Sequence, residues 1–114
     1  MPPDVQEFLT RWSSDVVSHD MGKVMAHYSE KYLNSGVTKG EAERTWKMVI
    51  DRVTSAEIAV TGLVPAGNRA YLAGFIRFGW GKEMMKGTAI TNENGEWRWY
   101  GNQRDPPPPP PPFW

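Results

Sequence analysis

The chain has 114 residues, and its thirteen basic side chains balance thirteen acidic ones, so the formal net charge is zero. Phosphate binding needs a clustered cationic excess, so this balance argues against nucleic acid as a partner. The absence of cysteine excludes disulfides and thiolate metal sites. No stretch approaches the ~20 apolar residues of a membrane span. We expect a soluble protein, and we favour a cytoplasmic location over export with removal of a leader, because the first residues carry no signal region.

The first half of the sequence predicts three helices. The first carries one apolar stripe at helical spacing, formed by Val5, Phe8, Leu9, Trp12 and Val16. Asp20 is typical of an N-cap, and it opens a second helix whose apolar positions extend to Tyr28. Thr38 and Glu41 form a capping box, which predicts the start of a third helix with an inward Trp46. Residues 32–36, between the second and third helices, predict a loop or a short edge strand.

The second half predicts four strands joined by short turns, over residues 55–64, 69–80, 83–91 and 96–103. Asn94-Gly95 is the strongest hairpin signal in the chain. Short links between consecutive strands indicate an antiparallel meander. Helices followed by a run of strands indicate an α+β fold with the helices on one face of the sheet.

The long strand at 69–80 is apolar on both faces. One face carries Tyr71 and Phe75, and the other carries Leu72 and Ile76. Three helices cover only one face, so we predict that a second copy of the chain covers the other, as a homodimer through the sheet. The alternative is a monomer that tolerates some exposed aromatic side chains.

Several of these residues together resemble a known family. The resemblance lies in the order of elements: a long first helix, an Asp-capped second helix and a pair of tyrosines after it. The residues that follow this order are Trp12, Asp20, Tyr28 and Tyr32. The ending at residues 94–103, after the inward Trp46, is similar to the last hairpin of the nuclear transport factor 2-like superfamily. The resemblance covers residues 4–103 through diffuse motifs. It implies a curved sheet of four or more strands with three helices in its concave face, a pocket between them, and a dimer through the convex face.

The domain organisation follows from the composition. We expect one α+β domain over residues 1–105 and a separate segment over residues 106–114, which we call the proline segment. Its seven prolines, beginning at Pro106, predict a polyproline II rod of roughly 22 Å at ~3.1 Å per residue. Phe113 and Trp114 follow the rod. The segment either docks on a partner, docks on its own or a neighbouring subunit, or has no role.

The superfamily includes isomerases and lyases, so we weighed acid–base candidates. Asp15 either points as a base into the cone, the space enclosed by the curved sheet and the helices, or pairs with Arg11 on the solvent face. His27 is either a general base at the pocket mouth or a surface histidine. The apolar strand centres carry no titratable pair, which argues against catalysis. If the protein is an enzyme, a cofactor-independent isomerase or lyase of ketosteroid-isomerase type is the expected class. The two histidines are too poorly spaced to predict a metal site.

The aromatic residues are the more informative candidates. They either line a pocket for a small apolar or aromatic molecule or pack as core, and the small residues at mid-strand fit both interpretations. The predicted pocket residues are Trp12, Tyr28, Tyr32, Trp46, Tyr71, Phe75, Met85 and Trp99. The sequence therefore favours small-molecule binding, with an assembly module and a small enzyme as the alternatives.

Overall fold

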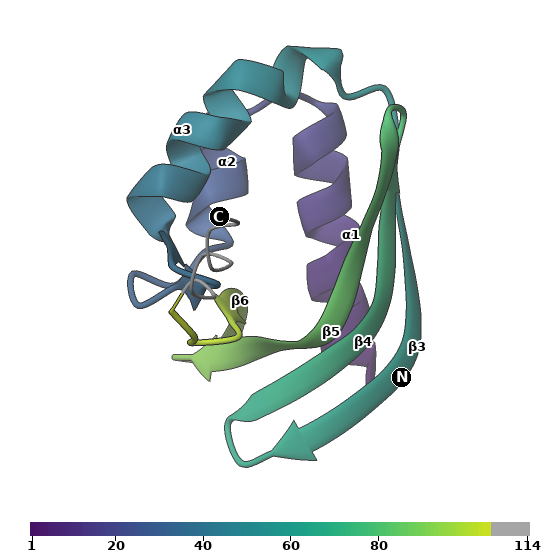
Figure 1. Ribbon diagram of the computed structural model, residues 1–114. Coiled ribbons are helices and arrows are strands. Elements are labelled where there is room, and N and C mark those ends of the chain that lie inside the picture. Colours follow the sequence, from purple (N-terminus) through teal and green to yellow (C-terminus); the bar gives the residue numbers. More distant parts are fainter. Residues whose placement is uncertain (106–114) are drawn as a thin grey trace, which may run out of the picture.

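The computed structural model describes residues 1–105, in which helices pack against a four-stranded sheet that curves around α1 (Figure 1). The elements are α1 (Pro3–Val17), α2 (Met21–Ala26), β1 (Leu33–Asn34), β2 (Val37–Thr38), α3 (Lys39–Val49), a 3-10 turn (Ile50–Arg52), β3 (Ala56–Ala66), β4 (Arg69–Phe78), β5 (Gly81–Glu93) and β6 (Glu96–Gly101). The sheet is antiparallel throughout, in the order β3-β4-β5-β6. This is the predicted α+β meander. The proline segment lies outside the described residues, and none of the described helices is long and apolar enough to cross a membrane.

Helix α1 forms the centre of the core. All five residues of its predicted apolar stripe are buried, and Trp12 is only 2% exposed. The helix packs against α2 and lies along the sheet between β3 and β6 (Figure 1). The hydroxyl of Ser13 donates to the carbonyl of Ala56, which fixes α1 to the first residue of β3. The stripe therefore faces the concave side of the sheet.

Both predicted helix caps are present. The Asp20 carboxylate accepts a hydrogen bond of 3.1 Å from the backbone N–H of Lys23 at the start of α2. Thr38 and Glu41 form the reciprocal capping box at the start of α3. These two caps set where α2 and α3 begin, because each satisfies N–H groups that have no partner within the helix.

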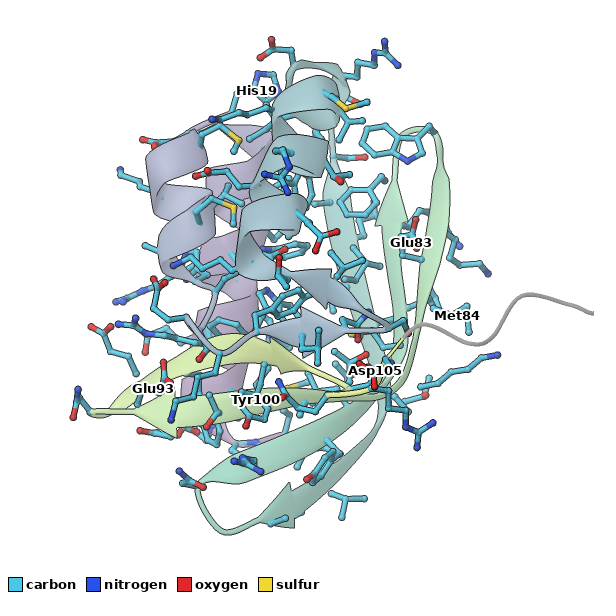
Figure 2. All side chains as sticks on the ribbon, turned by 60° about the vertical axis from the view of Figure 1, so that its left-hand side comes forward. His19, Glu83, Met84, Glu93, Tyr100 and Asp105 are labelled. Carbon is cyan, nitrogen blue, oxygen red and sulfur yellow. The ribbon has the colours of Figure 1, made fainter. Side chains whose placement is uncertain are left out.

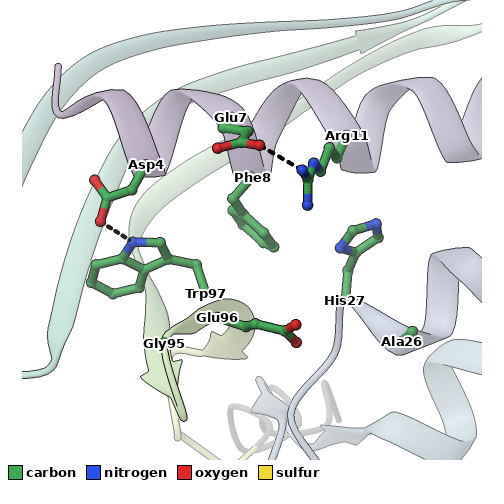
Figure 3. A pocket seen from close by; sticks show the side chains of 9 residues that line it. All are labelled: Asp4, Glu7, Phe8, Arg11, Ala26, His27, Gly95, Glu96 and Trp97. Carbon is green, nitrogen blue, oxygen red and sulfur yellow. Dashed lines mark hydrogen bonds and ion pairs between the residues drawn. The ribbon is translucent and has the colours of Figure 1, made fainter.

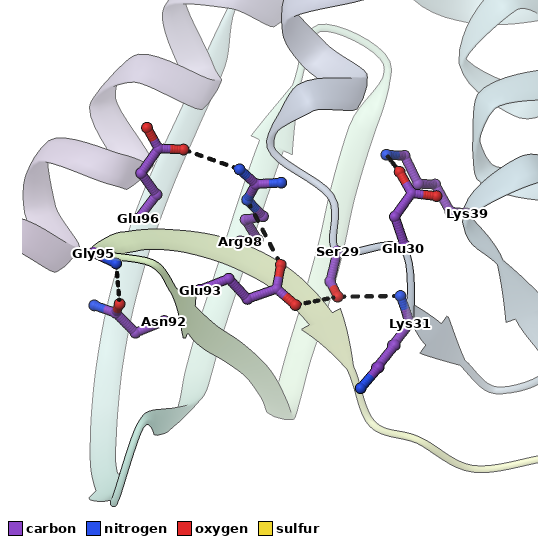
Figure 4. Close-up of polar contacts among 9 residues, drawn as sticks. All are labelled: Ser29, Glu30, Lys31, Lys39, Asn92, Glu93, Gly95, Glu96 and Arg98. Atoms are coloured by element: carbon purple, nitrogen blue, oxygen red, sulfur yellow. Dashed lines mark hydrogen bonds and ion pairs between the residues drawn. The ribbon is translucent and has the colours of Figure 1, made fainter.

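Helix α2 ends at Ala26, before the predicted boundary at Tyr28. The next residues instead run beside β6, where the N–H of Trp99 donates to the carbonyl of His27 at 2.7 Å and the N–H of Ser29 donates to the carbonyl of Trp99 at 2.9 Å. The hydroxyl of the fully buried Ser29 also donates to Glu93, which pairs with Arg98 (Figure 4). The main chain at Tyr28 is therefore held against the sheet edge.

Two bulges bend the sheet at the same level of β4. Thr61 in β3 and Gly87 in β5 are the extra residues, and both lie opposite the stretch from Leu72 to Gly74. An extra residue leaves one strand locally unpaired and increases its bend and twist. These two insertions contribute to the curvature around α1, and a third irregularity lies at Tyr100, where β6 pairs with β5.

The two faces of β4 have different surroundings. Leu72, Ile76 and Phe78 point toward the helices and are buried. Tyr71 and Phe75 point to the opposite, convex face, where Arg77 and Lys82 lie over the Phe75 ring. Because both faces are apolar, the sequence could not indicate which one faces inward.

Candidate functional site

A cavity of about 190 Å³ lies inside the curved sheet, between α1, α3, β1 and the inner faces of β4 and β5. Six of the residues that line it are aromatic: Trp12, Tyr28, Tyr32, Trp46, Phe78 and Trp99. The others are Asn34, Ile76, Glu83, Met84, Met85 and Thr88. An apolar cavity of about 150 Å³ in another protein holds benzene. This one is therefore of a size for a single ring or a small fused ring system.

The short last strand explains where the cavity opens. Strand β6 pairs only with Ala89–Glu93 of β5, so within the described residues Gly81–Thr88 has no strand partner on that side. Glu83 and Met84 lie in this uncovered half of β5 (Figure 2). Both are exposed and both belong to the cavity rim. Glu83 pairs with the inward Ile76, whereas Met84 pairs with Phe75, so the Met84 side chain points to the convex face and its neighbouring backbone forms the rim.

The aromatic walls pack edge to face around Trp12. Its ring centroid lies 5.4 Å from that of Trp99, 6.1 Å from that of Trp46 and 6.4 Å from that of Phe78. Edge-to-face contacts contribute about 0.5–1.5 kcal/mol each beyond the area they bury. The walls are therefore held by one another before any ligand enters.

Two tyrosine hydroxyls add polar groups to this surface. The indole Nε1–H of Trp46 donates to the hydroxyl of Tyr28 at 2.9 Å, which leaves the hydrogen of that hydroxyl for donation. Burial raises the pKa of Tyr28 well above its usual range, against a smaller lowering by Trp46. Burial also raises the pKa of Tyr32 to about 12. Both side chains are therefore neutral hydrogen-bond donors at neutral pH.

Two further donors have no partner. Among the described residues, the buried Nε1–H groups of Trp12 and Trp99 make no hydrogen bond. Trp12 lies close enough to Tyr28 to lower the pKa of its hydroxyl slightly, without reaching hydrogen-bond geometry. An indole nitrogen can only donate, and leaving a buried donor unpaired costs about 1–3 kcal/mol. Both nitrogen atoms are fully buried in the aromatic packing, so these unpaired donors lie behind the surface of the cavity.

The structure brings Asp15 and His27 together, but outside the cavity. His27 Nε2 lies 2.7 Å from an Asp15 carboxylate oxygen, across the α1–α2 contact. The expected pairing of Asp15 with Arg11 is wrong, because Arg11 pairs with Glu7 at 2.6 Å one turn earlier. Neither Asp15 nor His27 lines the aromatic cavity, so neither points into the cone as a base.

His27 instead lines a second hollow, of about 220 Å³, between α1 and the β5–β6 hairpin (Figure 3). The charged groups of α1 there are already partnered. The carboxylate of Asp4 accepts a 2.8 Å hydrogen bond from Trp97 Nε1, which lowers the pKa of Asp4, and Glu7 pairs with Arg11. Within residues 1–105 no group of three or more potential ligand side chains comes together to hold a metal ion.

The aromatic cavity contains six of the eight pocket residues expected from the sequence. Tyr71 and Phe75 lie on the convex face instead, because the Leu72–Ile76 face of β4 turns inward. The sequence prediction did not include Phe78 or Thr88. Phe78 lies on the same face of β4 as Ile76, and Thr88 in β5 pairs with the inward Leu72, so both would follow once one inward residue of β4 was known. The sequence prediction also missed Asn34, which reaches the site through a hairpin with no distinctive sequence signal.

Comparisons with known proteins identify the fold. The sequence matches no family model, and it matches no curated protein. A solved nuclear transport factor 2-like protein of unknown function from Pseudomonas putida superposes with a TM-score of 0.62 and 17% identity, over 85% of this chain and 80% of that one. A protein of unknown function with a cystatin-like fold from Nostoc punctiforme superposes with a TM-score of 0.61 and 13% sequence identity, over 86% of this chain and 84% of that one. A conserved protein from Planctomyces limnophilus superposes with a TM-score of 0.66 and 15% sequence identity, over 86% of this chain and 89% of that one. The chain therefore has the nuclear transport factor 2-like fold that the sequence resemblance implied.

Proposed function

We propose that this protein, as a homodimer, binds a small aromatic molecule that carries a hydrogen-bond acceptor, within the cavity of its nuclear transport factor 2-like fold. The observation that carries the proposal is the aromatic lining of the cavity, to which Tyr28 contributes a hydroxyl that accepts from Trp46 and keeps its own hydrogen for donation. An acceptor on the ligand would accept from this hydroxyl or from that of Tyr32. The aromatic walls would bury its ring.

The cavity supports binding better than catalysis. Its titratable side chains are Glu83, which is exposed at the rim, and the tyrosines, whose pKa values are raised. The one close acid–base pair, Asp15 with His27, lies outside it. An isomerase or lyase reaction on a molecule in the cavity therefore gains no support from the two residues proposed for it.

The test compares two probes of the same planar skeleton. Acetophenone has a ring and a carbonyl acceptor, whereas α-methylstyrene replaces the carbonyl oxygen with an apolar methylene group. One net hydrogen bond contributes about 0.5–1.5 kcal/mol, so acetophenone should bind about 2- to 10-fold more tightly. Titration of the ¹⁵N-labelled protein by NMR should move the indole signals of Trp12 and Trp99. The Trp97 signal is the internal control, because its N–H already donates to Asp4 outside the cavity.

A variant that fills the cavity tests the location of the bound probe. Thr88→Leu adds volume to a lining residue and should weaken acetophenone binding several-fold. Thr45→Leu makes the same change on the exposed face of α3 and should leave binding unchanged. Equal affinities for the two probes, with unmoved Trp12 and Trp99 signals, would refute the proposal.

A further inference from the structure

The lining of the aromatic cavity carries a single charged side chain, that of Glu83. Because Glu83 pairs with the inward Ile76 of β4, its side chain lies on the cavity side of β5, at the rim (Figure 2). None of the ion pairs among residues 1–105 involves this carboxylate. The mouth of the cavity is therefore negative.

The cations that neighbour Glu83 along β5 lie on the other face of the sheet. Lys82 is on the convex face, where its ammonium nitrogen lies 4.7 Å from the centroid of the Phe75 ring. Lys86 pairs with Ala73, which shares the convex face of β4 with Phe75. Successive side chains of a strand point to opposite faces. This alternation separates the charges of β5, with the cations outside and the carboxylate inside.

The aromatic walls add to the preference for positive charge. The face of an aromatic ring attracts a cation that lies within about 6 Å of its centroid. Tyr32, Trp46 and Phe78 all contribute rings to the lining. Aromatic rings are the groups that proteins use to recognise organic ammonium ions. The walls and the rim therefore favour the same sign of charge on a ligand.

From these observations we infer that the ligand of the cavity is an aromatic ammonium compound. Its ring lies among the aromatic walls, its acceptor meets the hydroxyl of Tyr28 or Tyr32, and its positively charged nitrogen lies at the rim beside Glu83. The inference rests on the proposed function, because it names the class of molecule bound at the same site. It also excludes aromatic carboxylates, which Glu83 would repel.

The experiment compares benzylamine with benzyl alcohol, which share a ring and a one-carbon arm. At neutral pH the first ends in an ammonium group and the second in an uncharged hydroxyl. Both are titrated at low salt into the ¹⁵N-labelled protein, with the indole signal of Trp46 as the readout and that of Trp97 as the internal control. An ion pair at an exposed rim is weak. The ratio of the benzylamine affinity to the benzyl alcohol affinity should therefore fall about 2- to 5-fold in Glu83→Gln.

Glu57→Gln is the matched control. Glu57 is also exposed, but it pairs with Arg77 on the convex face, so the variant loses the same charge without changing the rim. It should leave the affinity ratio unchanged. Added salt should lower the ratio in the wild type and in Glu57→Gln, and have little effect on it in Glu83→Gln, because ions screen an exposed ion pair.

The outcomes separate this inference from the proposed function. If acetophenone binds more tightly than α-methylstyrene but Glu83→Gln leaves the affinity ratio unchanged, the inference is wrong and the proposed function stands. If Glu57→Gln lowers the ratio as much as Glu83→Gln does, the effect belongs to the overall charge and the inference is wrong. If neither acetophenone nor benzylamine moves the Trp46 signal, both proposals fail.

Discussion

Tyrosine burial at the cavity makes stability sensitive to alkali. The pKa of Tyr32 is raised by burial to about 12 in the folded state, against an ordinary value of 10.0. The folded state therefore holds the phenol proton more tightly than the unfolded state does. This contribution to stability is fully present below pH 10 and is lost as the pH rises through about 12. Tyr28 acts in the same direction, because its pKa is raised as well.

Tyr32→Phe should separate this effect from other alkaline titrations. Its hydroxyl has no hydrogen bond among the described residues, so at pH 8 the variant should match the wild type within about 0.5 kcal/mol. Near pH 11.5 the variant should be the more stable by roughly 1–3 kcal/mol. Urea denaturation at both pH values measures this, and Tyr71→Phe on the convex face is the control. A constant difference across the pH range would show that Tyr32 does not titrate with a raised pKa.

Single residues also show where sequence reasoning is limited. The stripe of α1 was predictable, because helical spacing alone places Trp12 on the same face as Val5 and Val16. The partner of Asp15 was not. Spacing allowed Arg11 as a partner, but His27 comes from another helix, and only the packing of α2 on α1 brings it within 2.7 Å.

At the scale of the element, one glycine allows the bent sheet to form. Gly74 has a φ of +144°, and a Cβ there would lie 2.0 Å from the backbone carbonyl oxygen of Ala59 in the neighbouring strand. A backbone atom cannot swing aside as a side chain can. Gly74→Ala should therefore destabilise the protein by about 2–5 kcal/mol, combining backbone strain with overpacking.

Gly67→Ala is the matched control for that substitution. Gly67 also has a positive φ, of +63°, but a Cβ there meets no atom within 4 Å. It should cost only the backbone term, about 1–2 kcal/mol. Thermal or urea unfolding of both variants gives the difference. If the two glycine substitutions cost the same, the contact with Ala59 does not matter and the account of the bend is wrong.

Element boundaries were predictable where their cause is local. The Asp20 cap, the Thr38–Glu41 box and the Asn94-Gly95 turn each depend on a few adjacent residues, and all three are present. The end of α2 depends instead on β6, about seventy residues later, since Trp99 takes the main chain of His27 and Ser29 into the sheet. No periodicity within α2 contains that information.

At the scale of the whole molecule, the convex face of the sheet is the surface that bears on assembly. An apolar patch runs across it through paired positions of β3, β4 and β5, formed by Val64, Tyr71, Phe75 and Met84. Val64 is 63% exposed and Met84 is 59% exposed. Contiguous apolar surface of this kind marks interaction sites in proteins. It supports the proposed homodimer, with the helices covering one face of the sheet and a second copy covering the other.

A two-fold interface uses the same patch from both copies, so one substitution changes it twice. Tyr71→Lys places a cation in the patch, and Arg77 already lies six residues further along the same face of β4. In a dimer through this face the new charges would be brought together and lose water, which is unfavourable. Native mass spectrometry should therefore show a shift from dimer to monomer, while the unfolding midpoint measured under monomeric conditions changes little.

Met48→Lys provides the comparison for that change. Met48 is 75% exposed on α3, away from the sheet, so it should leave the dimer intact. The same spectra report any compound retained by the protein, and Tyr71→Lys should keep that compound because it leaves the cavity wall untouched. A wild-type protein that is monomeric at all concentrations, or a dimer that persists in Tyr71→Lys, would mean that the convex face is not the interface. In the second case two copies would associate through another surface of the molecule.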